Sequence, residues 1–397
     1  MKGLVLYKIY RALSYGLSPL IRLHLRWRRF RGLEHPRRWP ERLGHPSQSR
    51  YPGPLIWFHA VSLGEGMIAI PVIKQCIQKM PNLNVLVTTT TMSAFEVLSD
   101  RLPSEIIFQF SPLDTPASIH SFLHYWKPNA IVLMESELWP NLIMDASKNG
   151  IKLALLNARM SEKSFKIWSR SVVLPLISLM LSKFSLIAPL STVQGIRFQL
   201  LQASPSIINF SGDLKYVIED FGVNRGRKNL EDLRLQFAHK QVWLAASIHA
   251  GEEEIILGVH DALMQLQPNI MTIIVPRHPQ HGRDIAKKLE KEGQSVALRS
   301  QHEKLKPGTN IYVVDTLGSH VGHFSHMVLE MQRLNPLSVL QVSGKLELEK
   351  ALIKLLTNAT LLQAHRRASK EAFGLLSNDI VSNIWNLLNF HIFSRQR

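Results

Sequence analysis

Acidic and basic side chains follow short apolar runs at several points of this sequence, and their types suggest group-transfer chemistry. Glu65 lies between two glycines after "PLIWFHAVSL", and Glu135 directly follows "AIVLM". Carboxylates in such places could accept a proton from an attacking hydroxyl group. Lys215 and Arg277, further along the chain, could hold an anionic donor molecule. The pattern therefore predicts acid–base chemistry on a negatively charged substrate.

Other candidates for substrate binding stand in two later segments. Ser247 and His249 occur in "ASIHAGEEE", and Pro276 precedes Arg277 in "VPRHPQH". Each has an ordinary structural explanation as well, since Arg277 could be a surface residue and His249 could cap a helix that opens at Gly251. Acids in the first half of the chain and cations in the second nevertheless form a chemically complementary set.

Short apolar runs alternate with segments of helical length, which predicts parallel β-sheets covered by helices. A first series of predicted strands covers residues 53–61, 84–91, 105–112, 129–135, 152–159 and 185–191. A second series covers residues 208–213, 241–247, 270–276 and 310–315, with a helix expected within 223–236. The sequence thus predicts two doubly wound α/β domains facing a cleft. Ligands bind beyond the carboxyl ends of the strands in such sheets, which is where the candidate residues stand.

The composition is that of a globular protein with an anionic partner. A chain of 397 residues is long for one domain, so two domains are expected. Lys and Arg outnumber Asp and Glu by 47 to 30, which favours nucleic acid, a phospholipid surface or a phosphorylated substrate. Cys76 is the only cysteine, which excludes disulfides and cysteine-based metal sites within one chain. No nicotinamide, P-loop, zinc or nucleic-acid-binding motif is present, so no metal, cofactor or nucleic-acid partner is predicted.

The first 33 residues differ from the rest of the chain in charge. They hold eight Lys or Arg residues, and no acid occurs before Glu34. Pro19 interrupts any helix, and no apolar run approaches the length of a membrane span or a secretory signal. Residues 1–33 are therefore predicted to be a basic amphipathic segment at an anionic membrane surface. An organelle transit peptide and a solvated basic arm are the alternatives.

Nine blocks of the sequence, taken in order, resemble those of the 3-deoxy-D-manno-octulosonic acid (Kdo) transferases. They are "HAVSLGE", "TTTTMSAFE", "PLDTP", "MESELWPNLI", "LNARMSEKS", "SGDLK", "WLAASIHAGEEE", "IIVPRHP" and "VVDTLG". The similarity reaches about residue 318 and resumes near residue 320. Segments such as "GIRFQLLQA" and "HVGHFSHMVLEMQ" are most similar to the plant members of the family.

This resemblance implies a GT-B fold and transfer of Kdo from CMP-Kdo to a hydroxyl of a lipid A precursor (lipid IVA), with inversion and without a metal. Residues 34–207 would form the acceptor-binding Rossmann-like domain and residues 208–397 the CMP-sugar-binding one. Residues 1–33 would place the cleft at the membrane. In a plant member the same segment could direct the chain to the mitochondrion, whereas a bacterial member would act at the cytoplasmic face of the inner membrane.

The resemblance also implies roles for individual residues. Glu65 falls on the family's general base, and its neighbouring glycines would allow a tight turn with room for a sugar. Glu135 and Lys215 fall on transition-state stabilisers. The implied donor-binding positions are Pro276, Arg277, Leu317 and Gly318, with Ser247 and His249 as further substrate contacts.

The sequence departs from the family after "VVDTLG". The family continues with a glutamate, a helix and a "GHN…E" loop, but here Ser319 follows Gly318 and that loop is absent. About forty residues, roughly two βα units, are missing between well-matched flanks. A clean excision is therefore predicted, which leaves the C-terminal domain incomplete. A catalytically impaired product that retains only membrane or acceptor binding is the alternative to an active transferase.

Overall fold

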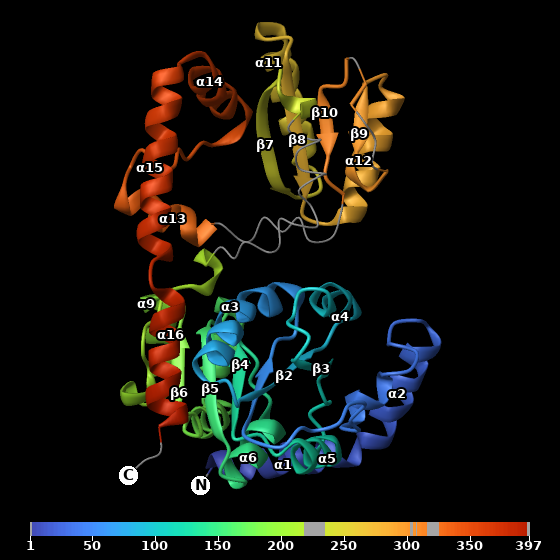
Figure 1. Ribbon diagram of the computed structural model, residues 1–397, viewed down its shortest axis with the longest axis vertical. Coiled ribbons are helices and arrows are strands. Elements are labelled where there is room, and N and C mark those ends of the chain that lie inside the picture. Colours follow the sequence, from blue (N-terminus) through green and yellow to red (C-terminus); the bar gives the residue numbers. More distant parts are fainter. Residues whose placement is uncertain (1, 218–234, 302–304, 307, 316–324, 395–397) are drawn as a thin grey trace. The chain divides into compact units, whose positions relative to one another are not determined.

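The computed structural model describes residues 2–217, 235–301, 305–306, 308–315 and 325–394, whose secondary structure is shown in Figure 1. The chain forms two compact units, one of Met1–Glu219 with Ser377–Arg397 and the other of Asp220–Leu376. The α/β class with two parallel-sheet domains is confirmed. The extents differ from the predicted ones, because residues 1–33, 208–219 and 377–397 all belong to the first unit.

A six-stranded parallel sheet forms the centre of the first unit. Its strands are β1 (Leu55–His59), β2 (Asn84–Thr89), β3 (Ile107–Phe110), β4 (Ala130–Met134), β5 (Lys152–Ala158) and β6 (Leu186–Pro189). Their spatial order is β3-β2-β1-β4-β5-β6. All residues of β1 and β4 are buried, as continuous apolar runs predict for strands covered on both faces. The carboxyl ends of β1 and β4 are neighbours at the point where strand order reverses, the usual ligand site of such sheets.

Helices cover both faces of this sheet (Figure 1). They are α1 (Lys2–Gly16), α2 (Ser18–Phe30), α3 (Leu63–Lys79), α4 (Met92–Ser99), α5 (Pro116–Trp126), α6 (Pro140–Lys148), α7 (Glu162–Trp168), α8 (Leu174–Leu181), α9 (Thr192–Leu200) and α16 (Ile380–Leu388), with short helices η1 (Trp39–Leu43), η2 (Pro205–Ile207), η3 (Leu214–Tyr216) and η5 (Asn389–Phe393). Phe122 of α5 and Met180 of α8 pack with Trp57 in one core cluster. Phe58, next to Trp57, is equally buried and points to the opposite face, where α3 and α4 pack against each other.

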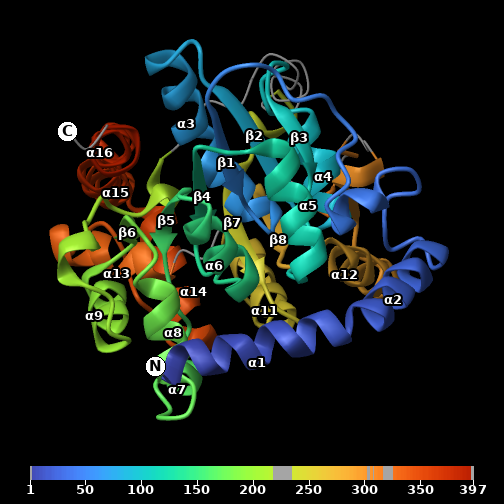
Figure 2. The ribbon, with the colours of Figure 1, turned by 90° about the horizontal axis from the view of Figure 1, so that it is seen from below.

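The N-terminal helix is a packed element of the first unit. Figure 2 shows α1 crossing near α8, and the two helices are in contact. Tyr7 is buried, Arg11 Nη1 lies 2.8 Å from Asp145 Oδ1, and Tyr10 donates a hydrogen bond to Asp114 Oδ2 at 2.9 Å. Residues 1–33 are thus packed on the first unit, which argues against the alternative of a solvated arm. Pro19 does interrupt the helix, since it lies in the first turn of α2, where a missing N–H costs nothing.

The outer sides of α1 and α2 carry apolar side chains that face solvent. These include Leu4, Val5, Ile9, Leu13, Leu20, Leu23, Trp27 and Phe30. Basic residues are interspersed among them along the same two helices. In the part of the chain that the structure describes, no helix combines the length and the apolar character that crossing a membrane requires. The predicted amphipathic character of this segment therefore agrees with its exposed surface.

The C-terminal helix returns to the first unit. α16 contacts α3 and β6, and Ile380 packs so closely on Gly212 that a Cβ at residue 212 would lie 3.0 Å from Ile380 Cγ1. His391 Nε2 and Asn209 Nδ2 lie 3.2 Å apart, in hydrogen-bonding contact. Residues 208–213 were expected to form the first strand of the second domain. Instead, only Ile208 makes a bridge, to Ile187 of β6.

The second unit has a four-stranded parallel sheet in the order β7-β8-β10-β9. Its elements are β7 (Gln241–Ile248), α11 (Glu253–Leu266), β8 (Ile270–Pro276), α12 (Pro279–Lys291), β9 (Val296–Leu298), η4 (Arg299–Gln301), β10 (Ile311–Val313), α13 (Ser325–Leu334), α14 (Gly344–Thr357) and α15 (Ala359–Ser377). Three of these strands were predicted, whereas the three-residue β9 was not. The helix expected within 223–236 falls almost entirely outside the described residues.

The edge strand β7 has an uncovered face. Among the described residues its only strand neighbour is β8. The side chains of Val242 and Leu244 are 38% and 54% exposed, whereas Trp243 and Ala245 on the other face are buried. Parallel sheets are normally covered on both faces. This exposed apolar face is what an incomplete C-terminal domain would leave.

The contact between α1 and α8 predicts a large cost for any side chain at Gly3. A Cβ there would lie 2.2 Å from the Pro175 carbonyl oxygen. We expect Gly3→Leu to lower the free energy of unfolding by about 2 kcal/mol, because overpacking forces backbone shifts. Gly16→Ala is the matched control, since its Cβ would meet nothing within 4 Å. Denaturant titration of both variants measures the effect, and equal stabilities would show that α1 does not pack as described.

Candidate functional site

Glu65 lies in the first turn of α3, which follows β1, and its carboxylate caps that helix. Oε2 accepts a hydrogen bond from the Val61 N–H at 2.8 Å, and Oε1 accepts one from Ser62 Oγ at 3.0 Å. Ser62 Oγ in turn accepts the Glu65 N–H at 3.4 Å. The sequence signal for this arrangement is Ser-x-x-Glu at a helix start. A carboxylate has about four acceptor sites, so these bonds leave capacity for a substrate hydroxyl.

The glycines on either side of Glu65 do not form the tight turn that was expected. Both lie within α3, and neither has a positive φ. A Cβ at Gly66 would lie 2.3 Å from Leu98 Cδ1, so this glycine lets α3 and α4 pack closely. Gly64 is exposed, and a Cβ there would meet only Ser62 Oγ, at 4.0 Å, so packing does not require a glycine at this position.

Glu135 follows β4 in a strained backbone conformation that β5 holds in place. Its φ is +53°, a region that non-glycine residues rarely adopt. The Glu135 N–H donates to the Leu156 carbonyl at 2.9 Å, and the Glu135 carbonyl accepts from the Arg159 N–H at 3.1 Å. Between those two partners the strand register is irregular, and Asn157 also has a positive φ of 51°. Such strain persists where surrounding bonds over-determine it, often at functional sites.

The same irregularity in β5 positions Lys215. The buried Asn157 side chain accepts the Leu214 N–H at 2.9 Å through its Oδ1 atom. Asp213, also buried, accepts the Lys215 N–H at 3.0 Å. These two bonds fix the short helix η3 and point Lys215 back toward the sheet. Lys215 therefore belongs to the first unit and not, as the sequence suggested, to a second cationic half.

Two cations hold the Glu135 carboxylate. Lys215 Nζ lies 2.9 Å from Oε1, and Arg159 Nη1 lies 3.6 Å from Oε2. The Glu135 side chain is 13% exposed, so these pairs are less screened than surface ion pairs. The structure thus brings together Glu135 and Lys215, and it places Glu65 close enough that the charge of Glu135 affects its pKa. Burial raises the pKa of Glu65, opposed by the Val61 hydrogen bond and reinforced by Glu135.

Glu137 is a further acid of this site that was not assigned a role from the sequence. Its Oε2 accepts the indole N–H of Trp139 at 2.7 Å. Burial, with the charge of Glu65 as the second cause, raises the pKa of Glu137 to about 7. The alternation Glu-Ser-Glu-Leu-Trp after β4 was the available signal, because residues that follow a switch-point strand face the ligand side. Three carboxylates therefore gather at the ends of β1 and β4, and Glu135 is the one that pairs with both Lys215 and Arg159.

The candidate donor-binding residues lie together in the second unit. Ser247, with a φ of +64°, lies near the end of β7 and His249 directly follows that strand, while Pro276 ends β8 and Arg277 directly follows it. The two strand ends are adjacent, with Ile248 paired to Pro276 and the Arg277 N–H donating to the Ile248 carbonyl at 2.9 Å. The His249 N–H donates to Glu252 Oε2 at 2.8 Å, while the His249 side chain is exposed. Helix α11 begins at Glu253 with Glu252 as its N-cap, so the suggested capping of a helix at Gly251 by His249 is not observed, and a substrate contact stays a prediction.

Two predicted donor-binding residues, Leu317 and Gly318, lie outside the described residues. Among those that are described, no group of His, Cys, Asp and Glu side chains is arranged to hold a metal ion. The chemistry that this arrangement can support is proton acceptance by Glu65, beside a Glu135–Lys215–Arg159 ion-pair network. Such a set suits attack by a hydroxyl group on a substrate with an anionic leaving group.

Comparison with known sequences gives a consistent result. Residues 37–218 match the family described as 3-deoxy-D-manno-octulosonic-acid transferase (kdotransferase). The chain is 58% identical to a probable mitochondrial 3-deoxy-D-manno-octulosonic acid transferase of Arabidopsis thaliana, over 98% of this chain and 97% of the relative. It is 32% identical to the 3-deoxy-D-manno-octulosonic acid transferase of Haemophilus influenzae, over 78% of this chain and 72% of the relative.

Two further comparisons concern the missing segment and the fold. The Arabidopsis alignment has 433 positions, whereas 98% of 397 residues is about 389, so about 44 positions have no residue in this chain. This number agrees with the predicted loss of about forty residues.

A crystal structure of UDP-N-acetylglucosamine 2-epimerase (TM-score 0.55, 11% identity) covers 88% of this chain and 98% of its own. The Neisseria meningitidis UDP-GlcNAc 2-epimerase (TM-score 0.55, 13% identity; 84% and 98% covered) shares the fold as well.

The raised pKa of Glu137 predicts a stability change with pH. In the unfolded chain this carboxyl titrates near 4.5, and in the folded chain near 7. Between these values the folded state binds more protons, so its contribution to stability falls as pH rises through this window. We expect Glu137→Gln to stabilise the chain by on the order of 2 kcal/mol at about pH 8 and to have little effect at about pH 4.5.

Urea unfolding of both proteins at the two pH values measures this effect. Glu162→Gln is the control, because the exposed Glu162 is paired with Lys166, which lowers its pKa. The small loss of stability from this control is present throughout the window in which Glu137 titrates, because its own pH dependence falls below that window. An equal gain from Glu137→Gln at both pH values would contradict the assignment.

Proposed function

Because this chain belongs to the family of 3-deoxy-D-manno-octulosonic acid transferases, we propose that it transfers Kdo from CMP-Kdo to a hydroxyl of a lipid A precursor. The enzyme class is that of its family, a glycosyltransferase. The observation that carries the proposal is that Glu65 and the Glu135–Lys215 ion pair lie together at the switch point of the first sheet, close enough for the charge of Glu135 to raise the pKa of Glu65.

In the proposed reaction, Glu65 accepts the proton of the acceptor hydroxyl. The hydroxyl oxygen then bonds to the anomeric carbon of Kdo, and the bond from that carbon to the CMP phosphate oxygen breaks. The electron pair leaves with CMP, and attack opposite the leaving group inverts the configuration. Lys215, held by Glu135, supplies positive charge as the phosphate departs. Pro276, Arg277, Ser247 and His249 are the residues that we propose contact the donor.

The acceptor of this reaction would be a lipid, and the helices α1 and α2 fit such a substrate. Their exposed apolar side chains, interspersed with Lys and Arg, suit an anionic membrane surface. We propose that this face brings the acceptor-binding unit to the bilayer. The mitochondrial designation of the Arabidopsis relative supports the same location for this chain.

The exposed face of β7 favours the second functional hypothesis, an impaired transferase that retains acceptor and membrane binding. Val242 and Leu244 lie on a strand that carries two candidate donor-binding residues at its end. A sheet that lacks two βα units would hold CMP-Kdo less firmly, since each 1.4 kcal/mol of lost binding energy weakens affinity tenfold. Acceptor binding depends on the first unit and would be retained.

Restoring the missing segment separates these two hypotheses. We expect the 397-residue chain to transfer Kdo slower by a factor of about 100 or more than a chain into which the corresponding segment of about 44 residues is inserted after Gly318. The measurement is the initial rate with CMP-Kdo and lipid IVA in detergent micelles. Comparable rates in the two chains would show that the excision is tolerated.

A carboxamide at residue 65 tests the general base. Glu65→Gln preserves an oxygen for the Val61 N–H, so the helix cap remains. We expect the rate of transfer by the restored chain to fall by about 10²–10⁴-fold, with the affinity for CMP unchanged. Glu96→Gln, an exposed carboxylate of α4, is the control. Near-normal turnover of Glu65→Gln would remove Glu65 from the mechanism.

A further inference from the structure

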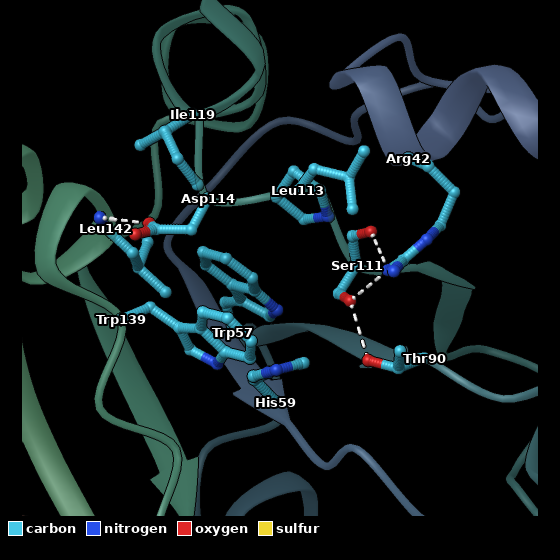
Figure 3. Close-up of a pocket in the computed structure, with 11 residues that line it drawn as sticks. Arg42, Trp57, His59, Thr90, Ser111, Leu113, Asp114, Ile119, Trp139 and Leu142 are labelled. Carbon is cyan, nitrogen blue, oxygen red and sulfur yellow. Dashed lines mark hydrogen bonds between the residues drawn. The ribbon is translucent and has the colours of Figure 1, made fainter. Parts of the chain in front are cut away.

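A small hollow at the carboxyl ends of β1, β2 and β3 contains a buried arginine without a counter-ion. Figure 3 shows Arg42 on one side of this hollow and Trp57, His59 and Trp139 on the other. The Arg42 side chain comes from η1 and is only 8% exposed. Burial lowers the pKa of Arg42, but an arginine stays protonated at neutral pH in proteins. The hollow therefore contains a positive charge that is largely removed from solvent.

The contacts of Arg42 account for only part of its guanidinium group. Nη1 donates to the Ser111 carbonyl at 2.6 Å and to Ser111 Oγ at 2.8 Å. Nε is buried and has no hydrogen-bond partner. In the described part of the chain no carboxylate lies within ion-pair distance of Arg42. The nearby acids are engaged elsewhere, Glu34 with Arg28 at 2.7 Å and Glu41 with Arg38 at 2.7 Å.

The one carboxylate that lines the hollow is also occupied. Asp114 accepts hydrogen bonds from Tyr10 Oη at 2.9 Å, from the Asn141 N–H at 3.1 Å and from the Leu142 N–H at 2.9 Å. In Figure 3 its oxygens face Leu142 and not Arg42. A buried charge without an ion-pair partner is costly, and the more distant charge of Glu34 and the two hydrogen bonds to Ser111 offset only part of that cost.

The remaining polar groups around the hollow are hydrogen-bond donors or can act as donors. Ser111 Oγ and Thr90 Oγ1 lie 3.1 Å apart beside Arg42. Thr88 Oγ1 accepts the Trp57 indole N–H at 2.8 Å and lies 2.9 Å from His59 Nδ1. If Thr88 gives its own proton to Nδ1, the neutral His59 ring carries its proton on Nε2. Burial lowers the pKa of His59 to about 3, so this ring is neutral at physiological pH.

The size and surroundings of the hollow indicate what could enter it. Its volume is about 50 Å³, enough for a small group such as a phosphate or carboxylate and too little for a sugar. A second hollow of about 390 Å³ shares Arg42, Thr90 and Leu113 with it. Its other lining residues are half apolar (Ile21, Leu25, Leu33 and Met92) and half polar or charged (His24, Thr91 and the paired Arg28 and Glu34). An anionic group beside apolar surface is the arrangement of an amphiphile.

We propose that Arg42, with Ser111 and Thr90, binds an anionic group of the acceptor glycolipid, and that Trp139 links this subsite to the reaction centre. Trp139 lines the hollow and donates its indole N–H to Glu137 at 2.7 Å, in the acidic cluster of Glu65 and Glu135. Occupation of the hollow would thus fix one end of the acceptor relative to the proton-accepting carboxylate. This inference rests on the proposed function for the identity of the ligand, but not for the anion site itself.

The anionic group could be a phosphate of the lipid or the carboxylate of an attached Kdo, and the binding experiment distinguishes these two sources. The probes are lipid IVA with both phosphates, the same lipid after enzymatic dephosphorylation, and the dephosphorylated lipid with one Kdo attached. Dissociation constants for the full chain are measured in detergent micelles from the quenching of tryptophan fluorescence. We expect the phosphorylated lipid to bind at least tenfold more tightly than the dephosphorylated one. Recovery of tight binding by the Kdo-bearing lipid alone would assign the site to a carboxylate instead.

Variants at residue 42 test whether this preference depends on the arginine. We expect Arg42→Met to bring the ratio of the two dissociation constants close to 1, and Arg42→Lys, which keeps the charge but loses the fork of donors, to give an intermediate ratio. Arg38→Met is the matched control. Arg38 comes from the same segment but is paired with Glu41 and bonded to the Phe108 carbonyl at 2.6 Å. Its loss should lower stability and leave the ratio unchanged.

The midpoint of thermal unfolding is a second measurement, which tests the anion site even if no lipid binds. We expect inorganic phosphate or acetate to raise the midpoint of the wild-type chain and not that of Arg42→Met. A rise in the midpoint with phosphate or acetate, but no binding of any lipid, would support the anion site. It would overturn the proposal that the acceptor glycolipid occupies that site. Equal affinity of the wild-type chain for phosphorylated, dephosphorylated and Kdo-bearing lipids would overturn the inference while leaving the proposed transfer reaction intact. The absence of any response to lipid, phosphate or acetate would overturn the inference as well.

Discussion

Glu135 leaves β4 with a left-handed backbone, and the bonds that hold it there come from Leu156 and Arg159, on either side of the irregularity in β5. Asn157, one of the two residues between these partners, uses its side chain to anchor η3 and thereby Lys215. One local defect in strand pairing thus sets the position of an acid and of both cations that neutralise it. A regular β5 would place Asn157 in the ladder and remove the support for all three charges.

The three acids at the strand ends differ in whether a cation pairs with them. Glu135 is compensated by two cations, whereas Glu65 and Glu137 have raised pKa values because burial, together with a neighbouring carboxylate, disfavours their ionised forms. Arg42, a short distance along the same edge of the sheet, shows the opposite imbalance, a cation without an acid.

The sequence was informative where burial alone determines structure. The strands of the first sheet could be predicted because Leu55–His59 and Ala130–Met134 are buried on both faces and therefore apolar throughout. Glu135 and Lys215 could be named because short motifs carry them. The packing of α1 could not be predicted, since its inner contacts are made by few residues, such as Gly3 and Tyr7, within an otherwise basic segment. The role of Arg42 could not be predicted from the sequence either, because a buried arginine without an ion-pair partner can be recognised only once its neighbours in space are known.

The return of α16 to the first unit also affects how the chain can fold during synthesis. Residues 220–376 form a unit that is inserted between the two parts of the first unit. The surface around Gly212 that Ile380 covers stays open until the ribosome has added about 170 further residues, which takes roughly 10–30 s at usual elongation rates. During that interval the first unit lacks its last helix. Shortening the insert by an excision would bring α16 out of the ribosome sooner, without changing the site where it docks.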